Sequence, residues 1–322
     1  MTPPSGTAVL ATETETPTPS PIRGTLGGEQ KNPAEQIALA LFIGIPFAAL
    51  IAAVPVMWGW GLSWVDIALV VVMYAITGHG ITIGFHRYFT HGSFKAGRKV
   101  RVALAIAGNM AVQGPLVRWV ADHRKHHKFS DQEGDPHSPW RYGGGVRNLA
   151  KGMWWSHMGW LFDPEQTPQD KYAPDLLKDA TMVRVSRQFP MWVAVSLTFP
   201  ALVGGLVTWS WQGALTAFFW AGLVRVALLH HVTWSINSIC HAVGKQPFRS
   251  RDKSTNVWWL AIPSMGESWH NLHHADQTAA RHGVLRGQLD TSARIIRWME
   301  KLGWVSDVRW PDRARIASRR AA

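Results

Sequence analysis

Long uncharged apolar stretches recur along the chain and set its architecture. Two of them run from Ile37 to Trp58 and from Ile67 to Phe85, and a third runs from Gln188 to Val224. A helix that spans a bilayer needs about 20 apolar residues. The third stretch is long enough for two such helices joined by a turn near Ser210–Gly213. The pattern therefore predicts four membrane-spanning helices.

Two features depart from this simple pattern. The apolar run from Val102 to Val117 is short for a crossing and contains Asn109, Gln113 and Pro115, so we interpret it as a buried or half-inserted helix. Arg225 lies near the middle of the fourth predicted span. Because a charge is costly at that depth, its side chain must face the protein interior or a polar cavity.

The formal net charge of +12 invites a nucleic-acid partner, but the placement of the 33 Lys and Arg residues argues against one. The two short loops at Gly59–Ser63 and Ser210–Gly213 carry none of them. By the positive-inside rule, both termini and the large central loop are then cytoplasmic. Tryptophans flank both bare loops, as in an interfacial aromatic belt; they are Trp58, Trp60, Trp64, Trp209 and Trp211.

The segments outside the predicted spans differ in composition. Residues 1–33 are rich in Thr, Pro, Ser and Gly and are expected to form a disordered cytoplasmic tail. Residues 34–308 should form one integral-membrane domain with a cytoplasmic helical cap, and residues 309–322 a basic C-terminal tail. Trp154, Trp155 and Trp160 could anchor the cap at the membrane surface. The single cysteine, Cys240, is expected to be a small packed side chain.

The strongest chemical signal is the clustering of histidines. Eight of the 15 histidines lie in three short windows. His123, His126 and His127 have the spacing i, i+3, i+4, which brings side chains to one helix face. The same spacing recurs later in the chain at His270, His273 and His274. A looser pair is formed by His86 and His91, and a single histidine lies at His241.

Nine imidazoles exceed what one metal ion binds, so two metal ions are implied. His86 and His91 are five residues apart and cannot point the same way on a regular helix. Either the helix ends between them or they address different metals. Asn237 lies four residues before His241, on the same helix face, where it could hold a water or ligate weakly.

Other polar residues near these histidines could support them. A carboxylate that accepts the second ring N–H of a ligand fixes its tautomer, and Asp122, Asp131 and Glu267 are candidates. The two aspartates could equally be helix caps or solvated charges. His79 is another candidate, although a polar group satisfied inside the helix bundle is the simpler interpretation. Thiolate clusters and a His-Glu-x-x-His motif are absent from the sequence, which argues against iron–sulfur centres and zincin proteases.

The histidine segments resemble the boxes of a known family. His86-Arg-Tyr-Phe-Thr-His91, Asp122-His-Arg-Lys-His-His127 and His270-Asn-Leu-His-His274 are similar to the three histidine boxes of the membrane fatty-acid desaturases. Trp234 to His241 resembles the additional Trp-x-x-Asn-x-x-x-His element of the acyl-CoA Δ9 branch. The likeness runs from about Ile37 to Trp304.

This resemblance implies an all-α membrane protein that removes two hydrogens from neighbouring carbons of a saturated acyl chain, in a bent tunnel, with O2 as co-substrate and two electrons. It implies two irons as cofactors and no catalytic residues beyond their ligands. Those ligands would be His86, His91, His123, His126, His127, His241, His270, His273 and His274, with Asn237 acting through water.

The resemblance also implies partners. These are a fatty acyl-CoA or another acyl carrier, the lipid bilayer, and a separate electron donor of the ferredoxin, cytochrome b5 or flavin reductase type. The animal acyl-CoA enzymes have Arg before the Asp-His of the second box, where this chain has Ala121. The head-group site would then be built differently, or the carrier is not CoA. The candidate substrate-binding residues are Arg118, Trp119, Arg184, Arg187 and Trp234.

Three alternatives stay open at this stage. A membrane di-iron hydroxylase would share much of the ligand set, because hydroxylation and desaturation differ in the fate of the second hydrogen. A zinc-dependent membrane hydrolase could also use imidazole ligands. A metal transporter would need ligands along a pathway near the bilayer midplane, whereas these histidines collect toward one face.

Overall fold

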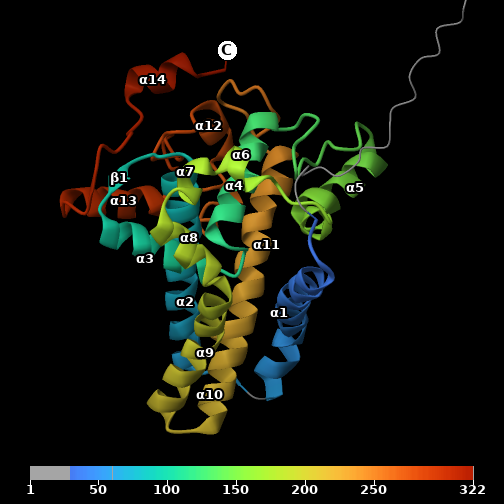
Figure 1. The fold of residues 1–322 in the computed structure, drawn as a ribbon, viewed down its shortest axis with the longest axis vertical. Coiled ribbons are helices and arrows are strands. Elements are labelled where there is room, and N and C mark those ends of the chain that lie inside the picture. Colours follow the sequence, from blue (N-terminus) through green and yellow to red (C-terminus); the bar gives the residue numbers. More distant parts are fainter. Residues whose placement is uncertain (1–29, 60, 322) are drawn as a thin grey trace, which may run out of the picture.

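Four long helical rods carry a cap of shorter helices at one end (Figure 1). The computed structural model describes residues 30–59 and 61–321. The tail expected over residues 1–33 therefore lies outside the described residues up to residue 29, as does Trp60, and the side chain of Trp58 is not described either. Within the described part, the chain is mostly helical, as the sequence predicts.

The four rods are long and apolar enough to cross a membrane, which confirms the four predicted spans. Each begins or ends within a few residues of the apolar runs, and two of them contain π-helical turns. Their bounds are α1 Pro33–Gly59; α2 Trp64–His79 continued by η1 Gly80–Thr90; α9 Phe189–Thr208; and α10 Trp211–Ala217 continued by η3 Phe218–Val224, α11 Arg225–Ser238 and η4 Ile239–His241.

Both connections between paired rods lie at the end away from the cap (Figure 1). Ser63 and Asp66 form a capping box that starts α2, with the Asp66 amide donating to the Ser63 hydroxyl at 3.2 Å. Ser210 caps α10 by accepting from the Gly213 amide at 3.0 Å. Trp209 and Trp211 flank this second turn with exposed side chains, as an interfacial position requires.

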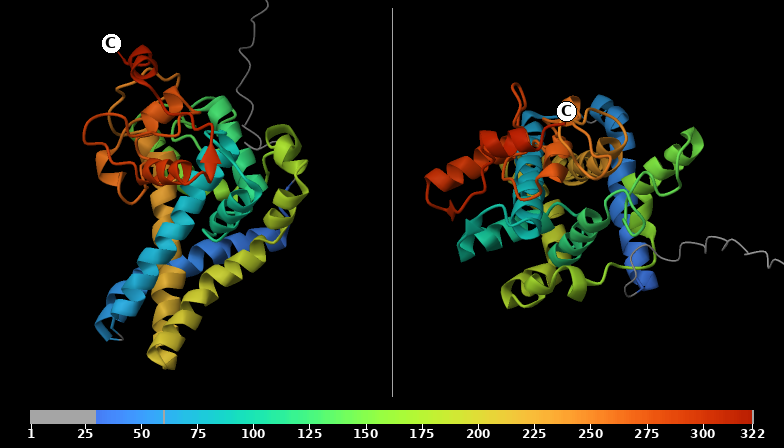
Figure 2. Two further views of the ribbon diagram at one scale, coloured as in Figure 1. Left: turned by 90° about the vertical axis from the view of Figure 1, so that its left-hand side faces the viewer. Right: turned by 90° about the horizontal axis from the view of Figure 1, so that it is seen from above.

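The cap combines segments from the middle and the end of the chain (Figure 2). A two-stranded antiparallel ribbon ties these two parts together, with Lys95 opposite Ser306. The elements outside the rods are β1 Lys95–Ala96, α3 Arg98–Asn109, α4 Leu116–Phe129, α5 Val146–His157, η2 Gly159–Phe162, α6 Gln169–Tyr172, α7 Pro174–Leu177, α8 Ala180–Arg187, η5 Trp258–Leu260, α12 His270–Ala275, α13 Thr291–Lys301, β2 Val305–Ser306 and α14 Arg313–Ser318.

A buried apolar cluster fixes α4 against η1, α3 and α8. Phe85, Leu116 and Val120 are fully buried within it. Ala121 belongs to the same cluster and has no exposed surface. The side chain at position 121 therefore points into the core and not toward solvent.

Two expectations about the apolar runs have different outcomes. The run from Val102 to Val117 is not one helix, because α3 ends at Asn109 and Val112 adopts a positive φ of 62° in the turn before α4. Arg225 faces the interior as expected. Its side chain has no exposed surface, and Nη2 donates to the Ser196 hydroxyl at 2.9 Å.

Both ends of the described chain pack onto the cap. Lys31 Nζ donates to the carbonyl oxygens of Leu161 at 2.7 Å and Asp163 at 2.8 Å. Near the other end, Arg315 of α14 forms an ion pair with Asp276, which directly follows α12. The segment expected as a basic tail thus contacts the helix that carries three of the candidate ligands.

Candidate metal centre

The second rod presents His86 and His91 through a π-helical ending. The His91 amide donates to the His86 carbonyl at 3.2 Å, an i to i+5 bond. This geometry stacks residues five apart, and the two ring centroids lie 4.9 Å apart. The helix ends at Thr90, between the two histidines, yet both join one cluster. The alternative that they address different metals is therefore wrong.

Nine of the described histidines form two neighbouring clusters. In each cluster the candidate ligand atoms all lie within 4.8 Å of one another. We name them the five-histidine cluster and the four-histidine cluster. The first contains His86, His91, His123, His127 and His273; the second contains His126, His241, His270 and His274.

Each histidine triplet divides between the two clusters. From α4, His123 and His127 contribute to the five-histidine cluster, whereas His126 contributes to the four-histidine cluster. From α12, His273 joins the first cluster and its two triplet neighbours join the second. Two short helices thus bridge both clusters, and the rods supply the remaining imidazoles.

The spacing of the ring nitrogens fits a metal ion in each cluster. The Nε2 atom of His273 lies 3.0 Å from that of His86 and 2.9 Å from that of His127. The Nε2 atom of His270 lies 3.1 Å from that of His241 and 3.0 Å from that of His274. With metal–nitrogen bonds of about 2.1 Å, adjacent corners of an octahedron are roughly 3.0 Å apart.

The tautomers give an independent reason for a cation. Nδ1 of His241 donates to Asp131 at 2.8 Å, and Nδ1 of His274 donates to Asp252 at 2.6 Å. A neutral imidazole carries one N–H, so both Nε2 atoms present bare lone pairs toward His270. His270 can donate to only one of them. A cation between the three rings removes the remaining lone-pair repulsion, so the residues fit a metal ion.

Carboxylates hold several of these rings, and sequence reasoning found only some of them. Asp131 and Glu267 were candidates, and Glu267 Oε2 lies 2.6 Å from His86 Nδ1. Asp135, 3.0 Å from His126 Nδ1, and Asp252 were missed. Asp135 follows its histidine by nine residues, and Asp252 precedes His274 by 22. Neither separation corresponds to a helical spacing, so only the fold could find them.

The other two supporting candidates lie away from the imidazole rings. His79 Nδ1 lies 2.8 Å from the carbonyl oxygen of Ala75 in its own helix, which matches the simpler interpretation of a satisfied polar group. Asp122 is half-buried beside Thr167, and burial of its carboxyl raises the pKa to about 6. His282 was missed by the sequence analysis; its Nδ1 lies 3.3 Å from Glu267.

Burial favours the uncharged form of five of these imidazoles, and a buried arginine keeps the Glu267 carboxylate charged. For five of the clustered histidines, desolvation lowers the pKa of the ring well below its usual value. They are His91, His123, His127, His270 and His273. Burial alone would raise the pKa of Glu267, but the Arg87 guanidinium and nearby imidazoles hold it well below its usual range. Neutral imidazole is the form that binds a metal.

A cavity of about 560 Å³ reaches the clusters, within the usual range for ligand pockets. His86, His123 and His270 line it together with apolar side chains of α1 and α11. Four of the five substrate-binding candidates and Asn237 also line it: Arg118, Trp119, Arg187, Trp234 and Asn237. Arg184 does not line this cavity; it lines a neighbouring surface hollow.

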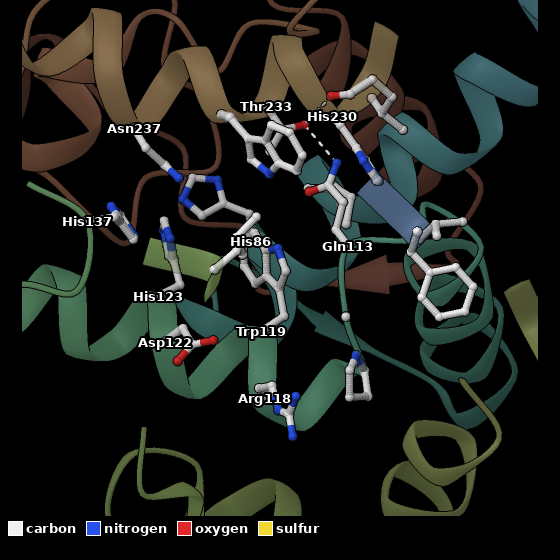
Figure 3. A pocket seen from close by; sticks show the side chains of 18 of the residues that line it. His86, Gln113, Arg118, Trp119, Asp122, His123, His137, His230, Thr233 and Asn237 are labelled. Carbon is white, nitrogen blue, oxygen red and sulfur yellow. Dashed lines mark hydrogen bonds between the residues drawn. The ribbon is translucent and has the colours of Figure 1, made fainter. Parts of the chain in front are cut away.

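Figure 3 shows the two sides of this cavity. Asn237, His123 and His137 lie together on one side, and Gln113, which donates to the Thr233 hydroxyl at 3.0 Å, lies on the other. Trp160 also lines the cavity, beside His137 with ring centroids 5.0 Å apart. Trp160 therefore faces the cavity and not the surface, unlike the membrane anchor expected from the sequence. Trp154 is exposed, as an anchor requires.

The fold and the site define a helical protein with four rods able to span a membrane and a buried two-part histidine site able to hold metal ions. The chain belongs to the fatty acid desaturase family, whose sequence pattern matches residues 62–284. This membership makes it an oxidoreductase of lipid metabolism and decides against the hydrolase and transporter alternatives.

Individual relatives differ in what their names say they act on. The chain is 40% identical to a hex-5-enoyl-[acyl-carrier protein] acetylenase of Moorena producens, over 88% of each chain. It is 32% identical to an sn-1 stearoyl-lipid 9-desaturase of Anabaena variabilis, over 90% of this chain and 99% of the relative. It is 37% identical to an acyl-CoA C20 Delta5-desaturase of Anemone leveillei, over 84% and 81%.

Proposed function

We propose that this protein introduces a Δ9 double bond into a saturated long-chain fatty acyl thioester, with acyl-CoA as the carrier, at a di-iron centre held by the nine clustered histidines. The observation that carries the proposal is the position of both histidine clusters against one mainly apolar cavity. Asn237 would complete the coordination through water.

The overall reaction balances with two electrons from outside. The acyl CH2–CH2 unit, O2, two electrons and two protons become an acyl CH=CH unit and two molecules of water. When bound, the iron pair supplies the oxygen activation that removes the two hydrogens. Imidazole donors suit iron as well as zinc, copper and nickel, and membership of the desaturase family favours iron.

The protein's own contribution is to hold the chain and exclude water. Apolar side chains such as Leu39, Phe42 and Leu229 line the cavity and would enclose the acyl tail. Trp119 stacks against His123 with ring centroids 4.9 Å apart, so it would press the chain toward the metal ligands. The length of acyl chain between the carrier and the metal ligands would select the carbon pair that is desaturated. The bent tunnel expected from the family would set this length.

Basic residues at the cavity support an anionic carrier. Lys31, Arg118 and Arg187 line it, and they would bind phosphate groups of a CoA head group through charge-assisted contacts. Ala121 points into the core and cannot take part. The names of the relatives include lipid, CoA and acyl-carrier-protein substrates, so the carrier is tested directly below.

The charge distribution supports a cytoplasmic position for the termini, the cap and the site. The loops at the far end of the bundle carry no Lys or Arg, as expected for the outer side of the membrane. A separate electron donor of the ferredoxin, cytochrome b5 or flavin reductase type would then reach the cap from the cytoplasm. A reporter enzyme that works only in the cytoplasm should be active when it is fused after residue 322. Activity of a reporter that works only in the periplasm or lumen would contradict this orientation.

The test is product formation by the purified, iron-loaded protein. With a reductant, a donor protein, O2 and stearoyl-CoA, we expect oleoyl-CoA, and we expect less product from stearoyl-acyl carrier protein or stearoyl-lipid. Replacing His126 or His273 with Ala should abolish the product, because each removes one candidate ligand from one cluster. His79→Ala is the matched control, since His79 lies outside both clusters.

Three results would contradict the proposal, the last of them only its carrier. Unchanged turnover in both ligand variants would remove the metal centre from the reaction. A product heavier by one oxygen would identify the hydroxylase alternative. A product formed from lipid-linked stearate but not from the thioester would keep the desaturase and overturn the carrier.

A further inference from the structure

Carboxylates are distributed unequally around the two histidine clusters. In the four-histidine cluster, three of the four rings donate from Nδ1 to an aspartate. These contacts are His126 to Asp135 at 3.0 Å, His241 to Asp131 at 2.8 Å and His274 to Asp252 at 2.6 Å. The fourth ring, His270, has no partner at Nδ1 among the described residues.

The three aspartates bring buried charge that the protein does not cancel. Their side chains are at most 3% exposed. In the described part of the chain, none of them forms an ion pair with lysine or arginine; their other bonds come from backbone amides and hydroxyls, such as the Lys253 amide to Asp131 at 2.9 Å. Three negative charges thus surround one metal position.

The five-histidine cluster has a different environment. Among its described rings, only His86 contacts a carboxylate, Glu267, at 2.6 Å. That carboxylate is itself paired with the fully buried guanidinium of Arg87 at 2.9 Å. The Nδ1 atoms of His127 and His273 have no hydrogen-bond partner among the described residues. This position is therefore surrounded by nearly neutral donors.

We infer that the two metal positions are unequal and that the four-histidine cluster stabilises the more highly charged ion. The ion in the five-histidine cluster then takes the first electron. In the oxidised protein it is also the first ion to be released. This inference rests on the metal binding of the proposed function. A carboxylate bonded to Nδ1 makes the imidazole a stronger donor, and losing such a partner typically costs about 10–100-fold in metal affinity.

The larger number of ligands in the five-histidine cluster favours tighter metal binding there. It does not change which position stabilises the higher oxidation state. The five-histidine cluster has one imidazole more, and that ring adds a neutral donor. Buried negative charge favours the higher oxidation state directly, because a charge in a low-dielectric interior acts strongly on a nearby ion. The three aspartates, which lack a lysine or arginine partner among the described residues, therefore determine which position remains ferric.

The first experiment follows iron release from the oxidised, fully loaded protein in detergent. With a mild chelator we expect two phases, each of one iron per chain, that differ at least about tenfold in rate. The emptied position is then refilled with ⁵⁷Fe, so that Mössbauer spectroscopy reports on that position alone. After addition of one electron per chain, the ⁵⁷Fe signal should become ferrous. A signal that stays ferric would overturn the inference.

Variants assign the two phases to the two clusters. Asp252→Asn should accelerate the slow phase about 10–100-fold and leave the fast phase unchanged. Asp135→Asn should do the same and serves as the second variant if the first fails to fold. Glu267→Gln is the matched exchange at the other cluster and should accelerate only the fast phase. The reverse assignment would overturn the inference.

The outcomes separate this inference from the proposed function. A folded chain that binds no iron would contradict both. A chain that binds two irons, desaturates stearoyl-CoA and releases both irons in one phase would contradict only the inequality of the two positions.

Discussion

Two fully buried arginines show how differently the cap junction and the rods are built. Arg87 lies where the second rod meets the cap, with its guanidinium 2.9 Å from Glu267 and 3.0 Å from Asp290. Arg225 lies in the fourth rod, where it donates to the hydroxyl of Ser196 at 2.9 Å and to a carbonyl one turn earlier. Both side chains have 0% exposed surface.

The difference lies in what each arginine leaves behind when it is removed. Glu267 contacts Arg87, His86 and His282, so the polar groups under the cap depend on one another. The partners of Arg225 are neutral, and a hydroxyl or carbonyl that loses one bond keeps no charge. The cap end is therefore coupled by charge, whereas the rods are held by packing and by separate hydrogen bonds.

The largest expected effect compares Arg87→Met with Arg225→Met. Arg87→Met leaves two buried carboxylates unpaired and should cost about 3–5 kcal/mol of folding free energy. Arg225→Met loses hydrogen bonds to neutral groups but also removes a buried charge, so it should cost no more than about 1–3 kcal/mol. Denaturant unfolding in detergent measures both values. Equal losses would contradict the comparison.

A smaller effect contrasts two glycines in the rods. A Cβ at Gly80 would lie 2.3 Å from backbone atoms of Ala107 and Gly108 in α3, whereas a Cβ at Gly44 would meet nothing within 4 Å. Gly80→Ala should therefore cost about 1–3 kcal/mol, because a packed backbone cannot yield easily. Gly44→Ala should be neutral or stabilise the helix by up to about 1 kcal/mol. Thermal unfolding of both variants sharpens the comparison between the junction and the lipid-facing surface.

The rods and the histidines that gather in the site could be predicted from the sequence for a physical reason. The length of an apolar run is a local property, and the helices follow those runs within a few residues. The i, i+3, i+4 spacing of His123, His126 and His127 is also local. The six histidines with this spacing gather in the two clusters together with His86, His91 and His241.

The arrangement inside the site depends on contacts between distant segments and could not be predicted. The triplets divide between the clusters because the histidines of α4, and likewise those of α12, reach both clusters. His91 joins His86 only through the π-helical turn. Asp135 and Asp252 reach their imidazoles across loops. Arg184 was chosen by charge alone and lies outside the large cavity.

The smallest expected effect tests whether the charge coupling of the cap reaches the C-terminal helix α14. Arg315 pairs with Asp276 and donates to the Thr278 hydroxyl at 3.0 Å, shortly after α12, the helix that carries His270, His273 and His274. Arg315→Ala should cost about 1 kcal/mol, the upper range for surface ion pairs, because the half-buried Arg315 contacts a buried carboxylate. The loss is not larger, because Arg319 remains 3.7 Å from Asp276 and takes over part of its charge. Arg313→Ala removes the same charge from an exposed position of the same helix and should leave the midpoint of thermal unfolding unchanged. A shift of equal size in both variants would mean that the helix acts only through its overall charge, and the coupling would then stop at α12.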